Sequence, residues 1–145
     1  MNKEIKLRTL NKEDYSAFLK VLHNLTQVGE ISKNDFDERL DILNKNDDYT
    51  LLVAEIDGKV VGSGTLFIEY KFIHSLAKKA HIEDIVVDKE YQGHGIGKMI
   101  VKRLVQLAEE KGCYKTALCT AQDKIPFYKK CGFEPKETEM VIYHK

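Results

Sequence analysis

Hydrophobic and charged residues alternate near the start of the chain, where Ile5 and Leu7 stand among the charges of EIKLRTL. This period of two predicts a short, half-buried strand. Apolar residues then recur with a helical period in NKEDYSAFLKVLHNL, where Asn11 is the expected N-cap, and in SKNDFDERLDILNKN, where Ser32 is the expected cap. Two helices are therefore expected before most of the strands.

Strand signals fill the middle of the chain. The segment YTLLVAEIDGKVVGSGTLFIEY predicts two strands joined at Asp57-Gly58, a dipeptide typical of tight hairpins. Further strands are expected in KAHIEDIVVDKEY, YKTALCT and EMVIYHK, with a long amphipathic helix after the first and a short helix over KIPFYKKCGF. The order β-α-α-β-β-β-α-β-α-β predicts one α/β (α+β) domain over residues 1–145, with helices packed on a mixed, mostly antiparallel sheet.

Composition excludes several classes of protein. The 145 residues contain 23 basic and 23 acidic residues, so no net field favours nucleic acid or an anionic membrane as a partner. The N-terminus has no apolar signal core, and no run of 18 apolar residues occurs. The three cysteines cannot all pair within the chain and lack the spacing of a metal site, which indicates reduced thiols in the cytoplasm and no bound metal.

Three glycines follow the strand predicted in HIEDIVV, at positions 93, 95 and 97 of QGHGIGK. Their spacing fits neither the P-loop nor the dinucleotide-binding fingerprint. They could simply turn the chain into the helix that follows. However, successive backbone N–H groups at a helix N-terminus can hold a diphosphate without a metal, and glycines let the phosphates come close. The loop is therefore a candidate pyrophosphate site.

This unit of strand, acidic turn, Gln92-x-x-Gly95-x-Gly97 and helix resembles the acetyl-CoA motif of the GNAT superfamily of N-acetyltransferases. The segments LTQVGEIS, KFIH, HIEDI, GCYK and FYKKCGF are similar, in the same order, to the glucosamine 6-phosphate N-acetyltransferases within it. The resemblance implies the GNAT fold with two splayed strands, acetyl-CoA as cosubstrate, an amino sugar phosphate as acceptor, and a homodimer that exchanges C-terminal strands. The implied reaction gives N-acetyl-D-glucosamine 6-phosphate, a step of UDP-N-acetylglucosamine biosynthesis.

The resemblance also implies the residues that contact the cosubstrate. Strand backbone would hold the pantetheine arm, and the glycine loop would hold the diphosphate. The implied cofactor-binding residues are Ile85, Val86, Val87, Gln92, Gly93, His94, Gly95, Ile96, Gly97, Lys98, Cys119 and Tyr128. Tyr128 is also the implied catalytic residue, because a phenol near the coenzyme sulfur can protonate the leaving thiolate. The alternative for Tyr128 is a packing role on an apolar helix face.

For the sugar phosphate, the implied residues are Thr26, Lys71, Phe72, Ile73, His74, Glu83, Asp84, Ile85, Tyr114 and Lys115. The cations among them suit a phosphate and the carboxylates suit an amine and hydroxyls, although each charge could instead form an ordinary salt bridge. Glu83 and Asp84 are adjacent on a strand, so we expect their side chains to point to opposite faces and only one to enter the site.

The chain departs from this family at three positions. Cys119 stands where an acid is expected, Lys124 where an asparagine is expected, and Tyr143 where a phosphate-binding arginine is expected. We expect Cys119 to be a buried strand residue and not a nucleophile, because direct attack of the amine on a bound thioester needs no acetyl-enzyme.

Two other functions remain open from the residues themselves. A protein of the same fold could acetylate another amine, such as a polyamine, an aminoglycoside or a protein N-terminus, or it could sense acyl-CoA without catalysis. The cations at positions 71, 74 and 115 favour a phosphorylated acceptor, and Tyr128 favours catalysis.

Overall fold

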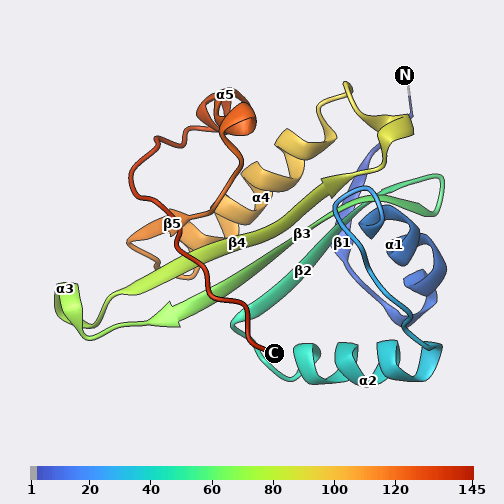
Figure 1. Ribbon diagram of the computed structural model, residues 1–145, viewed down its shortest axis with the longest axis horizontal. Coiled ribbons are helices and arrows are strands. Elements are labelled where there is room, and N and C mark those ends of the chain that lie inside the picture. Colours follow the sequence, from blue (N-terminus) through green and yellow to red (C-terminus); the bar gives the residue numbers. More distant parts are fainter. Residues whose placement is uncertain (1–2) are drawn as a thin grey trace.

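A five-stranded sheet forms the centre of the protein, and the computed structural model describes residues 3–145 (Figure 1). The strands are β1 (Lys6–Thr9), β2 (Tyr49–Ile56), β3 (Lys59–Tyr70), β4 (Lys78–Val87) and β5 (Lys115–Ala117). They lie in the order β1-β2-β3-β4-β5, and all neighbours are antiparallel except β4 and β5, which are parallel. The expected mixed, mostly antiparallel sheet is confirmed.

The helices of residues 3–145 include both N-caps that the sequence predicts. They are α1 (Tyr15–Leu22), α2 (Lys33–Asn44), α3 (Ile73–Leu76), α4 (Ile96–Glu110) and α5 (Ile125–Lys130), with 3₁₀ turns at Lys12–Asp14, Lys89–Tyr91 and Gln122–Lys124. The Asn11 side chain accepts a hydrogen bond from the backbone N–H of Glu13, at the turn that leads into α1. The Ser32 hydroxyl accepts one from the N–H of Asp35 at 3.0 Å. Both predicted caps are confirmed.

The hairpin between β2 and β3 forms at the predicted dipeptide. Asp57 has φ 50° and Gly58 has φ 77°, and positive values at both central residues are what a type I′ turn requires. The turn therefore fixes the register in which β2 and β3 leave the hairpin.

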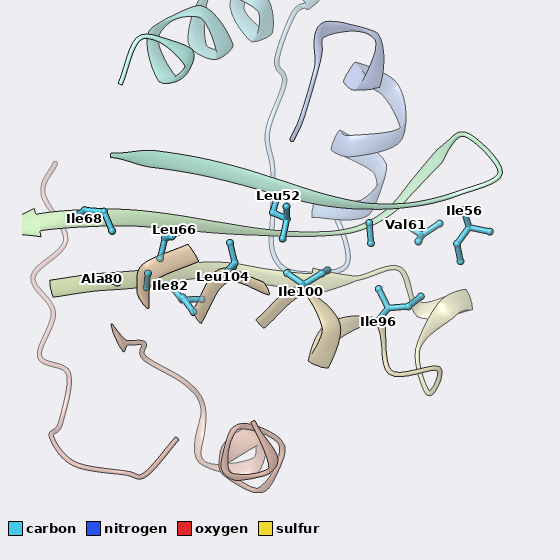
Figure 2. Close-up of a cluster of buried hydrophobic side chains, with 12 residues drawn as sticks. Leu52, Ile56, Val61, Leu66, Ile68, Ala80, Ile82, Ile96, Ile100 and Leu104 are labelled. Carbon is cyan, nitrogen blue, oxygen red and sulfur yellow. The ribbon is translucent and has the colours of Figure 1, made fainter. Parts of the chain in front are cut away.

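Helices cover both faces of the sheet (Figure 1). On one face, Ile96, Ile100 and Leu104 of α4 pack with Leu66 and Ile82 of the sheet in a cluster drawn in Figure 2. On the other face, α1 and α2 bury a second cluster of Leu10, Phe18, Val21, Phe36, Leu40, Val53, Val60 and Val86. Burying a side chain of this size contributes about 1.5–3 kcal/mol. The α4 cluster holds the first turn of α4 against the sheet.

The prediction of a strand over EMVIYHK is wrong for a single chain. Residues 139–145 form no strand, and Met140 and Tyr143 are 92% and 91% exposed. A strand needs a neighbouring strand to accept and donate its backbone hydrogen bonds, and this segment pairs with none of the strands in the described chain. No helix in residues 3–145 is both long enough and apolar enough to cross a membrane.

Candidate active site

The sheet opens between its last two strands. β4 and β5 are paired only from Lys79 to His81 on β4, and from Lys115 to Ala117 on β5. Beyond His81 the two chain segments separate, and a pocket of about 650 Å³ lies between them. The pocket is lined by Leu25, Thr26, Ile82, Glu83, Asp84, Ile85, Leu118, Cys119, Thr120, Ala121, Lys124, Tyr128 and Glu139. The expected splay is therefore present, and it leaves one edge of β4 unpaired beside the pocket.

A β-bulge in β4 decides which side chains face this pocket. Ser63 of β3 pairs with Val86 and Thr65 pairs with Glu83, so Asp84 and Ile85 together lie opposite the single residue between them on β3. Asp84 adopts the left-handed region, with φ 53°. Glu83 and Asp84 are consequently both exposed and both line the pocket. The expected alternation of the two side chains between opposite faces is not met, because the bulge interrupts it.

Gly64 makes room for the bulge. It lies on β3 opposite the bulge, and a Cβ added there would be 2.5 Å from Cδ1 of Ile85 and 2.9 Å from Cγ2 of Ile100. Sequence reasoning assigned Gly64 no role. A glycine inside a strand is a known signal of a bulge or of close backbone approach, and it could have indicated this one.

The glycine loop leads directly into α4. Gly95 is the N-cap residue with φ 80°, and no side chain caps the helix. The first amide N–H groups of α4 therefore have no acceptor within the helix, and they carry the positive end of its dipole. The Gln92 side chain donates a hydrogen bond to the carbonyl of Val87 at 3.1 Å, which ties the loop to the end of β4. The loop is therefore a candidate anion site, and it follows the same end of β4 as the unpaired edge.

The three glycines differ in their surroundings. A Cβ on Gly93 or Gly95 would meet nothing within 4 Å, so the space beside both is open to a ligand. A Cβ on Gly97 would lie 3.3 Å from Cζ of Phe127, so this glycine lets α5 pack on α4. Ile96 is buried in the core and offers a ligand only its backbone. The loop's other two candidate residues, His94 and Lys98, are exposed.

Tyr128 projects from α5 into the pocket. Its ring makes edge contacts with Phe127 and Phe133, at centroid distances of 4.9 Å and 6.0 Å. Burial raises the pKa of the Tyr128 phenol, and the nearby Cys131 raises it further. The hydroxyl therefore stays protonated at neutral pH and is available as a proton donor.

Cys119 does not have the environment that we expected. It is exposed and lies beyond β5, which ends at Ala117, because the chain leaves the sheet where the two strands separate. It lines the pocket together with Glu83 and Tyr128. Burial raises the pKa of the Cys119 thiol, and Glu139 and Glu83 add to the increase. The expectation of a buried strand residue is wrong, whereas a place near the cosubstrate stays a prediction.

The other candidate substrate residues form a second group at the far end of the β3–β4 hairpin. The rings of His74 and Tyr114 lie 4.8 Å apart, and Nζ of Lys115 is 5.5 Å from the Tyr114 ring centroid. Nζ of Lys71 forms an ion pair with Glu69 at 3.0 Å. Phe72 and Ile73 are 90% and 58% exposed in the same turn.

This second group does not line the pocket that holds Glu83 and Tyr128. Lys115 is paired with Lys79, four residues before Glu83, which corresponds to about 13 Å along a strand. Within one protomer, the predicted phosphate-binding cations and the predicted amine-binding carboxylates are thus separate.

No three His, Cys, Asp or Glu side chains in residues 3–145 are grouped so that they could hold a metal ion. The site is built instead from an unpaired strand edge, a helix N-terminus and a protonated phenol.

Comparison with known proteins identifies the class of this site. Residues 8–133 match the model of the acetyltransferase (GNAT) family, so the chain belongs to that family. Within the family it is 36% identical to the glucosamine 6-phosphate N-acetyltransferase of Arabidopsis thaliana, over 99% of each chain. It is 39% identical to the enzyme of the same name from Candida albicans, over 92% of each chain. The crystal structure of the Arabidopsis enzyme superimposes with a TM-score of 0.95 at 33% identity, covering 99% of this chain and 100% of that one.

If the open space at the glycine loop holds the cosubstrate diphosphate, Gly95→Ala should raise the Kd for acetyl-CoA at least about tenfold. The added methyl group would stand where phosphate oxygens approach the helix N-terminus and would weaken their charge-assisted hydrogen bonds. Isothermal titration calorimetry measures the effect.

Gly112→Ala is the matched control for this variant. Gly112 also has φ 80° and open space beside it, but it follows the opposite end of α4. Both variants should lose similar stability from left-handed strain. Equal acetyl-CoA affinity in the two variants would exclude the loop as the diphosphate site.

Proposed function

We propose that the protein transfers the acetyl group of acetyl-CoA to the 2-amino group of D-glucosamine 6-phosphate, giving N-acetyl-D-glucosamine 6-phosphate and coenzyme A. The observation that carries the proposal is the opening between β4 and β5, where a pocket lined by Tyr128 lies beside an unpaired edge of β4. The N-terminus of α4 follows the same end of β4 in the chain. The names of the relatives support this acceptor, and the matches to those relatives cover almost all of this chain.

The unpaired edge of β4 suits the elongated part of the cosubstrate. Backbone groups of Ile85, Val86 and Val87 can pair with the amides of a pantetheine arm as they would with a further strand. A backbone N–H of the same edge is placed to stabilise an oxyanion on the acetyl carbon. The diphosphate then lies at the first turn of α4, where the helix dipole favours negative charge.

Direct attack by the amine requires a proton acceptor and a proton donor. Glu83 is the better acceptor of the pocket carboxylates, because burial and the neighbouring charges of Asp84 and Glu139 raise its pKa. Tyr128 donates the proton that the departing thiolate takes up. Holding both reactants in one pocket supplies much of the remaining acceleration, so Cys119 needs no covalent role.

The phosphate of the acceptor is assigned to the second group, His74, Tyr114 and Lys115. Because this group does not line the pocket of its own protomer, a second copy of the chain would bring it to the acceptor. Two exposed apolar surfaces suit such an interface: the hairpin end with Phe72 and Leu76, and the C-terminal segment Met140–Tyr143. The proposal therefore includes a homodimer.

In solution, light scattering at micromolar concentration should give about twice the chain mass of 16.7 kDa. Deleting residues 140–145 should lower the mass toward that of one chain, because the deletion removes the exposed apolar segment. A wild-type mass near 16.7 kDa would contradict the dimer.

A thiol-release assay tests the proposed function. Purified protein with acetyl-CoA is offered glucosamine 6-phosphate, a polyamine, an aminoglycoside and a peptide with a free N-terminus. We expect the highest kcat/KM for glucosamine 6-phosphate and a product that mass spectrometry identifies as its N-acetyl derivative. Acetyl-CoA binding without turnover on any amine would instead indicate an acyl-CoA sensor.

A further inference from the structure

The C-terminal segment contributes a carboxylate to the active-site pocket. Glu139 lies nine residues after α5, outside every helix and strand, yet it lines the same pocket as Glu83, Asp84 and Cys119. Sequence analysis assigned Glu139 no role in the site and placed it at the start of the strand predicted over EMVIYHK.

Glu139 lines the pocket together with Glu83 and Cys119. It acts on the Cys119 thiol and on the Glu83 carboxylate, and it raises the pKa of both groups. Glu139 is exposed where it lines the pocket, so its carboxylate is open to a ligand that enters there.

The charges of the pocket favour a cation. Its ionisable lining groups are Glu83, Asp84, Glu139, Cys119, Tyr128 and Lys124. With the thiol and the phenol protonated, the charged lining groups are three carboxylates and the ammonium group of Lys124. Three acceptors on three different backbone positions match the three N–H donors of a primary ammonium group.

We propose that Glu139 is a substrate-binding residue that holds the amino group of the acceptor from the side opposite Glu83 and Asp84. This role rests on the proposed acetylation of an amino sugar phosphate, since it assigns one more contact to the same acceptor. It makes the C-terminal segment part of the site.

Steady-state kinetics of Glu139→Gln test this role. The variant removes the charge and keeps the shape, so KM for glucosamine 6-phosphate should rise about tenfold through loss of one charge-assisted hydrogen bond. The KM for acetyl-CoA and the melting temperature should stay unchanged. Glu137→Gln is the matched control, because Glu137 is an exposed acid of the same segment that does not line the pocket.

A second variant separates substrate binding from a local structural role. Cys119 lies beside Glu139, so Cys119→Asp in the Glu139→Gln background places a carboxylate at nearly the same point of the pocket. This double variant should recover most of the lost affinity for the amino sugar. Rescue would support a role for charge at the amine, since a merely structural contact of Glu139 would not be restored by an acid on another segment.

Two results would overturn the inference. One is an unchanged acceptor KM in Glu139→Gln while the wild type acetylates glucosamine 6-phosphate. The other is a raised KM that Cys119→Asp does not lower. Failure of the proposed function itself is a different result, in which the wild type has no activity toward glucosamine 6-phosphate.

Discussion

Replacing Tyr128 by phenylalanine is expected to lower kcat by about one to two powers of ten, the range of a single positioned acid. The aromatic ring keeps its edge contacts with Phe127 and Phe133, so α5 should stay in place. Only the hydroxyl that donates to the leaving thiolate is lost. The KM for acetyl-CoA should change little, because the strand edge and the glycine loop remain intact.

Stopped-flow and steady-state assays across a full pH profile measure this effect. In the wild type the Tyr128 pKa is raised by burial, so the phenol stays protonated and activity should persist well above neutral pH. Tyr49→Phe is a suitable control, because its ring stacks on Phe67 at 5.5 Å, far from the pocket lining. A Tyr128→Phe variant with wild-type turnover at every pH would show that Tyr128 has a packing role and no catalytic role.

The second large effect concerns the phosphate of the acceptor. Glucosamine without its phosphate should have a kcat/KM at least about a hundredfold below that of glucosamine 6-phosphate. Each charge-assisted hydrogen bond to the dianion contributes about 1.5–3 kcal/mol, and two such bonds give this ratio. Of the three residues predicted to bind the phosphate, Lys71 is already paired with Glu69. We therefore assign the phosphate contacts to His74 and Lys115, which lie beside Tyr114.

Variants of the second group locate the phosphate contact. His74→Asn keeps a residue that tolerates the positive φ of 51° at this position, and Lys115→Met keeps an unbranched chain of similar length. Both variants should lower kcat/KM for glucosamine 6-phosphate and barely change kcat/KM for glucosamine. Lys20→Met, on the exposed side of α1, removes the same charge far from the group and should affect neither. Equal efficiency toward both sugars in the wild type would refute the phosphate assignment.

Much of the fold could be predicted because its signals are local. The caps at Asn11 and Ser32 depend on hydrogen bonds that span two or three residues, and the hairpin at Asp57-Gly58 depends on two φ angles. The glycine loop is likewise contained in six residues between a strand and a helix. Such features depend on residues that are close in the chain, so the local pattern was sufficient to predict them here.

The arrangement of the pocket could not be predicted in the same way. Asp84 enters it through a bulge that exists only in the pairing of β4 with β3, and which Gly64 accommodates. Cys119 is exposed because β5 ends early, and Glu139 reaches the pocket from an irregular segment. Each of these placements depends on contacts between residues far apart in the chain.

The sequence by itself indicated the family through the resemblance of its motifs, and it determined most of the helices and strands and the glycine turn before α4, since these elements follow from short-range periodicity and backbone preference. The tertiary structure alone decided that Glu83, Asp84 and Tyr128 line one pocket, and that the cations predicted to bind phosphate do not line it. It also decided that residues 139–145 form no strand. Strand register, the splay of a sheet edge and the path of a terminal segment are set by the free energy of pairing and packing between distant segments, which no local pattern encodes.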